Sequence, residues 1–361
     1  MSVKLKAGII GCGGIANGKH MHGLHSLDTV EMVAFCDIIV SRAQEAKEKF
    51  GTSDALVFES YKEMLDKAGV DVVFVCTPNS SHCEISVAAL NAGCHVMCEK
   101  PMAMNYAEGK LMVETAKKAG KKLTIGYQNR FRADSEYLKR SCQNGDLGEI
   151  YFAKAHAVRR RAVPTWGVFL DAEKQGGGPL IDIGTHALDL TLWFMDNYKP
   201  KMVVGKTYRK LADQVETANA WGDWDPDVFT VEDSAFAYIT MENGATIFLE
   251  SSWALNILDT KEAVCTLCGT KAGADFDNDE LRINQVNYGK QVTVKPTLSA
   301  DGVAFYGGEK REPHQIEAAR WIDSIINDKS PVVLPEQALV VTQILEAVYE
   351  SAKTGKPVFF D

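Results

Sequence analysis

The first third of the chain alternates short apolar runs with helix-length amphipathic stretches such as residues 108–121. The apolar runs cover residues 4–11, 30–37, 70–78, 94–101 and 122–127. They lack the polar alternation of half-exposed strands, which indicates strands that helices cover on both faces. The pattern therefore predicts an α/β fold with a doubly wound parallel sheet, its strands joined by helical crossovers.

The alternating rhythm stops after residue 126. Helices are predicted over residues 134–144, 179–195, 313–327 and 336–353, with Pro179 in the first turn of its helix. Strands are predicted over residues 150–160, 202–211, 231–239, 245–253, 262–270 and 291–296. Turn signals between several of these strands favour a large, mostly antiparallel open sheet. We therefore predict two domains, residues 1–126 and residues 127–361, the second also of the α/β class.

The composition fits two soluble domains and argues against nucleic-acid and membrane partners. A chain of 361 residues fits about two domains of ~150 residues. The net charge is −9 at pH 7 and basic residues are dispersed apart from Arg159, Arg160 and Arg161, so no nucleic-acid partner is expected. Neither a signal segment nor a membrane span is visible, and an odd count of nine cysteines fits reduced thiols. We expect a cytoplasmic protein without a membrane partner.

A glycine-rich turn follows the first predicted strand. Gly11-Cys12-Gly13-Gly14-Ile15-Ala16 matches G-x-G-x-x-G/A in the strand–turn–helix setting that this fingerprint requires. Gly11 would permit the tight turn, Gly13 would let a pyrophosphate approach the backbone, and Ala16 would let the helix pack on the strand. The turn predicts a dinucleotide-binding Rossmann domain.

Asp37 ends the next predicted strand and sets the expected cofactor. It lies about 20 residues beyond the glycine motif, the spacing of the acid that accepts hydrogen bonds from the adenosine ribose. A carboxylate there would repel the 2′-phosphate of NADP, so NAD is expected in preference to NADP. Arg42 is close enough in sequence to stack on adenine or to offset part of that repulsion.

Two further loops follow predicted parallel strands, where open α/β sheets place their ligands. One carries Thr77-Pro78-Asn79 with His82, and the other carries Glu99-Lys100-Pro101. The Lys100 ammonium could hydrogen-bond a substrate hydroxyl and stabilise developing alkoxide charge. Taken alone, a lysine of this kind is more often a surface charge.

Asp182 and His186 stand four residues apart on the predicted helix 179–195, so both project from one face. Removal of hydride from a secondary alcohol leaves an oxygen that must lose its proton, and imidazole is a suitable base near neutral pH. His186 is the candidate base, and Asp182 would orient the ring or bind a neighbouring hydroxyl. In isolation such a pair is more often a helix-surface ion pair.

These motifs occur in order along the whole chain and together resemble the Gfo/Idh/MocA family of oxidoreductases. The glycine motif, Thr77-Pro78-Asn79, Glu99-Lys100-Pro101 and the segment from Gly178 to His186 carry the resemblance. It implies NAD(P)-dependent redox chemistry on sugars or cyclitols and a homodimer or homotetramer formed through the C-terminal sheet. It also implies that Lys100, Asp182 and His186 form the catalytic set.

The expected contacts of cofactor and substrate follow from these segments. For the cofactor they are Gly11, Gly13, Gly14, Ile15, Ala16, Asp37, Arg42, Thr77, Pro78, Asn79, His82, Glu99, Lys100 and Gln128. For the carbohydrate they are Lys100, Asn129, Arg159, Trp166, Asp182 and His186. Arg159 would bind hydroxyls or an anionic group and Trp166 would offer an apolar face to a sugar ring, but a solvated strand end with a packing tryptophan explains both residues equally well.

The function predicted from the sequence is an NAD-dependent dehydrogenase that acts on a ring secondary alcohol of a sugar, glycoside or cyclitol, in either direction. Two alternatives stay open: an enzyme that recycles bound NAD while it eliminates or cleaves a sugar, and a non-catalytic NAD-binding regulator. No metal site is expected, because His20, His22 and His25 fall near the crossover helix without zinc spacing.

Overall fold

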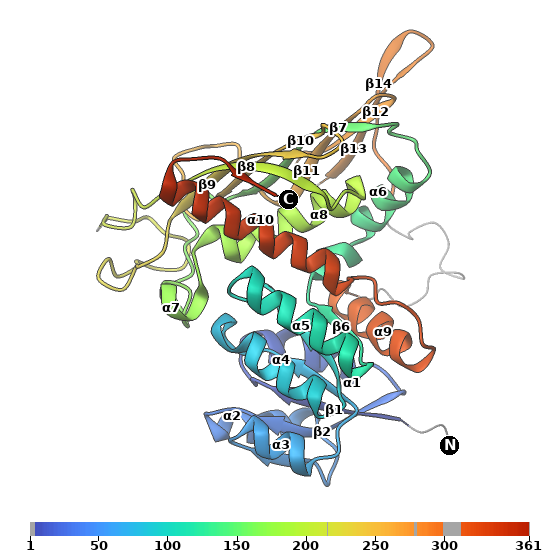
Figure 1. Ribbon diagram of the computed structural model, residues 1–361, viewed down its shortest axis with the longest axis vertical. Helices are drawn as coiled ribbons and strands as arrows, with labels where there is room; N and C mark the ends of the chain where they lie inside the picture. Colours follow the sequence, from blue (N-terminus) through green and yellow to red (C-terminus); the bar gives the residue numbers. More distant parts are fainter. Residues whose placement is uncertain (1–3, 215, 278–279, 299–311, 361) are drawn as a thin grey trace. The chain divides into compact units, whose positions relative to one another are not determined.

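The computed structural model describes residues 4–214, 216–277, 280–298 and 312–360, and these form two compact units (Figure 1). The first unit holds the described residues within 1–131 and 309–339, and the second those within 132–308 and 340–361. Residues 312–339, which we expected in the second domain, thus belong with the first unit. The reason is packing: Ala318, Trp321 and Ile322 of this segment are buried in one core cluster with Met21 and Leu24.

A six-stranded parallel sheet forms the centre of the first unit. Its strand order is β3-β2-β1-β4-β5-β6, and the order turns from one direction to the other between β1 and β4. The strands are β1 (Leu5–Ile10), β2 (Val30–Cys36), β3 (Leu56–Phe58), β4 (Val72–Val75), β5 (His95–Cys98) and β6 (Leu123–Ile125). The predicted doubly wound sheet is confirmed, and the carboxyl ends of β1 and β4 are its switch point for ligand binding.

Helices cover this sheet. They are α1 (Met21–His25), α2 (Val40–Phe50), α3 (Tyr61–Lys67), α4 (His82–Asn91), α5 (Tyr106–Ala119) and α9 (Pro313–Ile326). Shorter helical turns are η1 (Ala16–His20), η2 (Asn79–Ser81) and η3 (Gln128–Phe131). All four residues of β4 are fully buried, which explains why the sequence of a central parallel strand is continuously apolar.

The second unit is built on a nine-stranded mixed sheet of order β14-β13-β12-β11-β7-β10-β9-β8-β15. Only β7 and β10 pair in parallel, and the other pairings between its described residues are antiparallel, as predicted. The strands are β7 (Ile150–Val158), β8 (Pro200–Tyr208), β9 (Ser234–Met241), β10 (Thr246–Ser252), β11 (Lys261–Gly269), β12 (Ala272–Asp277), β13 (Glu280–Asn287), β14 (Lys290–Val294) and β15 (Val358–Phe359).

One helix lies at the centre of the second unit. The turn η4 (Leu180–Gly184) leads into α8 (Thr185–Met195), which contacts β7 and β11 and is buried along nearly its whole length. The other helices are α6 (Ala133–Gln143), α7 (Ala172–Gln175) and α10 (Pro335–Thr354), and α10 contributes residues to both units. Among the described residues, no helix combines the length and the hydropathy needed to cross a bilayer.

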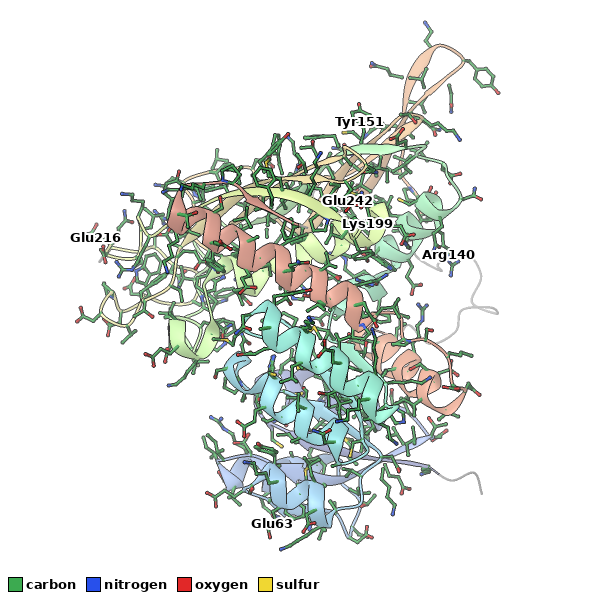
Figure 2. All side chains as sticks on the ribbon, in the orientation of Figure 1. Glu63, Arg140, Tyr151, Lys199, Glu216 and Glu242 are labelled. Atoms are coloured by element: carbon green, nitrogen blue, oxygen red, sulfur yellow. The ribbon has the colours of Figure 1, made fainter. Side chains whose placement is uncertain are left out.

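Charged side chains lie on the outside of both units. Glu63 of the first unit and Lys199 and Glu242 of the second are exposed and project from the ribbon (Figure 2). Buried charges are therefore the exception in this protein, and each needs a structural or chemical reason.

Candidate active site

The glycine turn after β1 has the two properties that a dinucleotide site needs. Gly11 has a φ of +89°, and a Cβ atom added to it would lie 2.6 Å from the carbonyl oxygen of Cys76. Gly13 and Gly14 face open space, because a Cβ atom on either would meet nothing within 4 Å. Gly11 is thus required by the fold, whereas Gly13 leaves free the space in which a ligand would approach the backbone.

Asp37 ties the end of β2 to this turn. Its Oδ2 accepts a hydrogen bond from the backbone N–H of Cys12 at 2.8 Å, and its Oδ1 accepts one from the N–H of Ile39 at 2.8 Å. The carboxylate is therefore fixed in direction while its oxygens keep capacity to accept from ribose hydroxyls. Arg42, near the start of α2, is exposed.

Lys100 lies in the turn after β5, next to Glu99, which belongs to a buried ion pair. The Glu99 Oε2 accepts the backbone N–H of Lys100 at 3.0 Å, and Glu99 Oε1 lies 2.6 Å from Nε2 of His20. Burial opposes ionisation of both groups, but their mutual hydrogen bond and charge outweigh it, so the pKa of His20 is raised and that of Glu99 falls to about 2. Glu99 thus positions the backbone that carries Lys100.

A second acidic group, Glu317 of α9, lies close to this ion pair. Burial, with a contribution from the charge of Glu99, raises the pKa of Glu317 to about 8, although His20 acts in the opposite direction. Its Oε1 is buried and has no hydrogen-bond partner among the described residues. At neutral pH the carboxyl group is therefore held protonated inside the first unit.

We expect Glu317→Gln to remove a pH dependence of stability. Between the ordinary glutamate pKa of 4.5 and about 8, the folded state binds this proton and the unfolded state does not, so stability falls as pH rises through this window. The glutamine variant has no such proton to lose. Its free energy of unfolding relative to the wild type should therefore rise by about 1–3 kcal/mol between pH 5 and pH 8, measured by urea unfolding.

The control for this prediction is Glu336→Gln. Glu336 belongs to the same unit but is exposed, with Lys117 at 2.9 Å. The control variant should differ from the wild type by the same free energy at every pH in the series. A flat difference for Glu317→Gln as well would show that Glu317 is ionised in the folded protein.

The His82 side chain contacts two loops, the one after β4 that carries Thr77 and the one after β5 that carries Pro101. Its ring is fully buried, with Nδ1 2.8 Å from the carbonyl oxygen of Pro101 and Nε2 2.9 Å from that of Thr77. The ring therefore joins the loop after β4 to the loop after β5. Asn79, in the turn η2, is also buried.

Gln128, which follows β6, is another of the predicted cofactor residues. Its Oε1 accepts a hydrogen bond from Lys19 Nζ at 2.7 Å, which links it to the turn η1 behind the glycine motif. Asn129 follows it and is half-buried. Apart from Arg42 on α2, the predicted cofactor residues of the first unit thus follow the carboxyl ends of β1, β2, β4, β5 and β6. The open space at Gly13 fits the backbone approach of a pyrophosphate.

Asp182 and His186 occupy the buried junction of η4 and α8 in the second unit. Asp182 Oδ2 accepts a hydrogen bond from Nε1 of Trp253 at 3.0 Å and lies 4.0 Å from Nη1 of Arg159. Asp182 and His186 are each less than a tenth exposed. The alternative of a helix-surface ion pair is therefore wrong, because Asp182 is held by an indole and a guanidinium inside the unit. An acidic group fixed in this way one turn from an imidazole can orient a substrate or a base.

Arg159 connects this carboxylate to a group of aromatic side chains. Its guanidinium makes two hydrogen bonds to Glu262, and its carbon Cζ lies 5.2 Å from the ring centroid of Trp221. The rings of Trp221 and Trp166 are 5.0 Å apart. Trp166 is 53% exposed, so part of its ring faces solvent although the ring also packs on Trp221.

Some residues of the site could not be found from the sequence. Trp221 and Glu262 contact Arg159, and Trp253 contacts Asp182, although each pair is far apart in the sequence. Only the fold of the second unit brings these residues together. Glu317 comes from a helix assigned to the other domain. The triplet Glu99-Lys100-Pro101 was the one signal that pointed toward the His20–Glu99 network.

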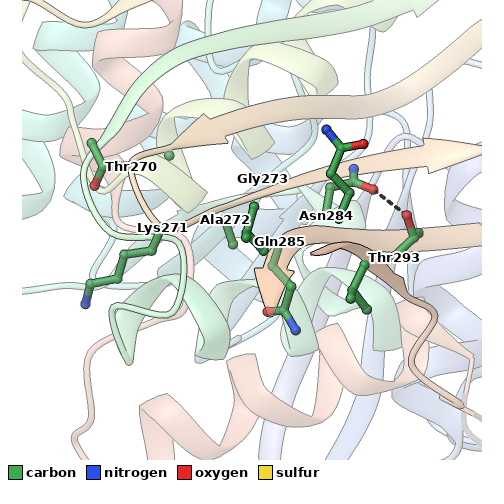
Figure 3. Close-up of a pocket in the computed structure, with 11 residues that line it drawn as sticks. Thr270, Lys271, Ala272, Gly273, Asn284, Gln285 and Thr293 are labelled. Atoms are coloured by element: carbon green, nitrogen blue, oxygen red, sulfur yellow. Dashed lines mark hydrogen bonds between the residues drawn. The ribbon is translucent and has the colours of Figure 1, made fainter. Parts of the chain in front are cut away.

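The second unit has a hollow of about 420 Å³ beside the hairpin turns of β11–β12 and β13–β14, and neither Asp182 nor His186 lines it (Figure 3). Backbone and amide groups line it, with Lys271 and the hydrogen bond from Thr293 Oγ1 to Asn284 Oδ1 at 3.1 Å. None of the described residues that line it is acidic, a histidine or a cysteine. The chemistry of the proposed reaction therefore does not reside there.

Comparison with known proteins decides the family. Residues 5–127 match the family model described as "Oxidoreductase family, NAD-binding Rossmann fold", and residues 139–360 match "Oxidoreductase family, C-terminal alpha/beta domain". The chain belongs to the Gfo/Idh/MocA family. Its first unit is accordingly an NAD-binding Rossmann domain, as the glycine turn and Asp37 predict.

Relatives of this Gfo/Idh/MocA protein extend over its whole length. It is 38% identical to the D-glucoside 3-dehydrogenase of Escherichia coli (strain K12) over 357 residues, which cover 99% of this chain and 98% of the relative. It is 27% identical to the glucose-6-phosphate 3-dehydrogenase of Bacillus subtilis (strain 168), with 98% of each chain covered. An oxidoreductase domain protein from Kribbella flavida has the same fold, with a TM-score of 0.86 at 23% identity over 99% of this chain and 100% of that one.

Proposed function

We propose that this protein is an NAD-dependent dehydrogenase that oxidises a ring secondary alcohol of a sugar, glycoside or cyclitol, or catalyses the reverse reduction. The observation that carries the proposal is the buried Asp182, which Trp253 and Arg159 hold one turn before His186, in a chain whose other unit binds NAD. The names of the relatives support the substrate class, since they include a D-glucoside 3-dehydrogenase and a glucose-6-phosphate 3-dehydrogenase.

The residues of the first unit would hold the cofactor in a defined orientation. The turn at Gly13 and Gly14 would receive the pyrophosphate, and Asp37 would accept hydrogen bonds from the adenosine ribose. NAD supplies the acceptor for the hydride that leaves the carbinol carbon. Because the Asp37 carboxylate would repel the 2′-phosphate of NADP, NAD is the preferred cofactor in our proposal.

Three side chains of this chain carry the proton chemistry in our proposal. His186 takes the hydroxyl proton as the C–H bond breaks, so that a ketone forms from the alcohol. Lys100 donates a hydrogen bond to the same oxygen and stabilises the charge that develops on it. Asp182 orients the substrate or the imidazole, and its own direction is fixed by the indole N–H of Trp253.

The proposal is tested with a panel of sugars, glycosides and inositols, with NADH formation followed by absorbance. We expect net NADH in proportion to substrate consumed, with kcat/KM at least about tenfold lower when NADP replaces NAD because of the charge of Asp37. Complete conversion of a sugar without accumulating NADH would instead support the internally recycled chemistry. Absence of turnover across the panel, with NAD binding intact, would favour a non-catalytic regulator.

We also propose that the protein forms a homo-oligomer through the exposed face of the second sheet. Tyr208, Tyr238 and Phe248 are each about two-fifths exposed on β8, β9 and β10. The Tyr238 and Phe248 rings are 5.5 Å apart across paired strands. Adjacent exposed aromatics on one sheet face are typical of a protein interface, and a face that pairs with its own copy gives a closed dimer.

The nine cysteines are free thiols, which supports a cytoplasmic location.

A further inference from the structure

A chain of aromatic side chains runs from Asp182 to the surface of the second unit. The indole N–H of Trp253 donates to Asp182, and the ring of Trp253 lies 6.4 Å from that of Phe169. Phe169 is 5.9 Å from Trp166, which in turn is 5.0 Å from Trp221. Each pair meets edge to face, so the four rings form one continuous wall, here called the aromatic wall.

The two ends of the aromatic wall differ in exposure. Trp253 is fully buried, whereas Trp166 and Trp221 are 53% and 44% exposed. These two large exposed indoles are in contact and leave apolar ring surface open to solvent. The outer end is therefore a surface that a flat apolar group could cover.

Polar contacts fix the outer end in place. Asn219 Nδ2 donates to the carbonyl oxygen of Val163 at 3.0 Å, and its Oδ1 accepts the N–H of Val163 at 2.8 Å. Thr165 Oγ1 donates to the carbonyl oxygen of Trp221 at 2.8 Å. The loops that carry the two indoles are thus joined to each other, which lowers the entropy cost of ordering a bound ring between them.

The hydrogen bond from Trp253 already connects the aromatic wall to Asp182, and Arg159 makes a second connection to the same carboxylate. Its guanidinium lies over the Trp221 ring at 5.2 Å, and its Nη1 is 4.0 Å from Asp182 Oδ2. One guanidinium group thus separates the outer indole from the carboxylate that orients the reacting sugar in the proposed function. A group bonded to that sugar, rather than the sugar itself, would reach Trp166 and Trp221.

We propose that Trp166 and Trp221 form a subsite for the aglycone or second sugar ring of a glycoside, which binds through its apolar face. This inference rests on the proposed function and deepens it, since it makes a substituted glycoside, rather than a free monosaccharide, the preferred substrate. Aromatic contacts of this kind are worth about 3- to 10-fold in affinity.

The test compares the methyl glycoside, the phenyl glycoside and the corresponding disaccharide of the sugar that the enzyme oxidises. In the wild type we expect kcat/KM for the phenyl glycoside or the disaccharide to exceed that for the methyl glycoside by about 3- to 10-fold. In Trp166→Leu and Trp221→Leu this ratio should fall to about 1. A purely structural role would lower all substrates equally and leave the ratio unchanged, which would overturn the subsite.

Binding provides a second measurement that does not need turnover. Phenyl β-D-glucoside should quench tryptophan fluorescence of the wild type and bind at least about threefold more weakly to either variant. The control is Tyr288→Leu, which removes an exposed aromatic ring at the β13–β14 turn and should change neither binding nor the ratio. Turnover of carbohydrates without any preference for the larger glycosides would overturn the subsite alone, whereas aglycone-dependent binding without turnover would overturn only the dehydrogenase proposal.

Discussion

Replacement of Lys100 by methionine is expected to lower kcat by about 10²- to 10⁴-fold while NADH binding stays measurable. Methionine keeps the length of the side chain and removes the ammonium that, in our proposal, hydrogen-bonds the reacting oxygen. The backbone of this turn should persist, because the N–H of Lys100 and the His20 ring hold Glu99, and neither contact involves the lysine side chain. Steady-state kinetics with the best substrate of the panel and a fluorescence titration with NADH measure the two effects separately.

The matched control for Lys100→Met is Lys110→Met. Lys110 lies on α5 of the same unit, is well exposed, and is 3.9 Å from Glu114 across one helical turn. Loss of this ammonium should leave kcat and the unfolding midpoint close to those of the wild type. If Lys100→Met retained kcat within about tenfold of the wild type, the assignment of Lys100 to the reacting oxygen would be refuted.

The long elements of both units could be predicted from the sequence because their hydrophobic patterns are strong. The apolar run at residues 70–78 became the fully buried β4, and the helical spacing after Pro179 became η4 and α8. The shorter β3 was missed because three residues carry too little pattern. The strands β12 and β13 were also missed, since residues 272–277 contain alanine, glycine and aspartate, and pairing with β11 and β13 decides their conformation.

The candidate site was predictable only where its residues lie close together in the sequence. The glycine turn, the Lys100 turn and the Asp182–His186 pair each form a local pattern. The contacts that position them do not: Trp253 reaches Asp182 across 71 residues, and Glu99 reaches His20 across 79. In the sequence His20 stands beside His22 and His25, and only the fold pairs it with the carboxylate of Glu99.

The contrast between two glycines gives the sharpest test of the cofactor site. Gly13→Val is expected to weaken NADH binding by about 100-fold or more, because its side chain would fill the space through which the pyrophosphate approaches the turn. The protein itself should tolerate the change, since a Cβ atom there meets nothing within 4 Å and the backbone φ of Gly13 is not in the left-handed region. We expect its free energy of unfolding to stay within about 1 kcal/mol of the wild type.

Gly11→Ala should mainly lower the stability of the fold, whereas Gly13→Val should mainly weaken NADH binding. A Cβ atom at Gly11 would lie 2.6 Å from the Cys76 carbonyl oxygen and 2.9 Å from the backbone nitrogen of Thr77, on a residue with φ of +89°. Strand β1 and the end of β4 would have to separate, which should cost about 2–4 kcal/mol of unfolding free energy. Urea unfolding and NADH titration of both variants separate the roles. The Gly13→Val variant is expected to keep its fold, so only the space above the turn changes. Wild-type NADH affinity in this variant would therefore mean that the pyrophosphate does not pass over this turn.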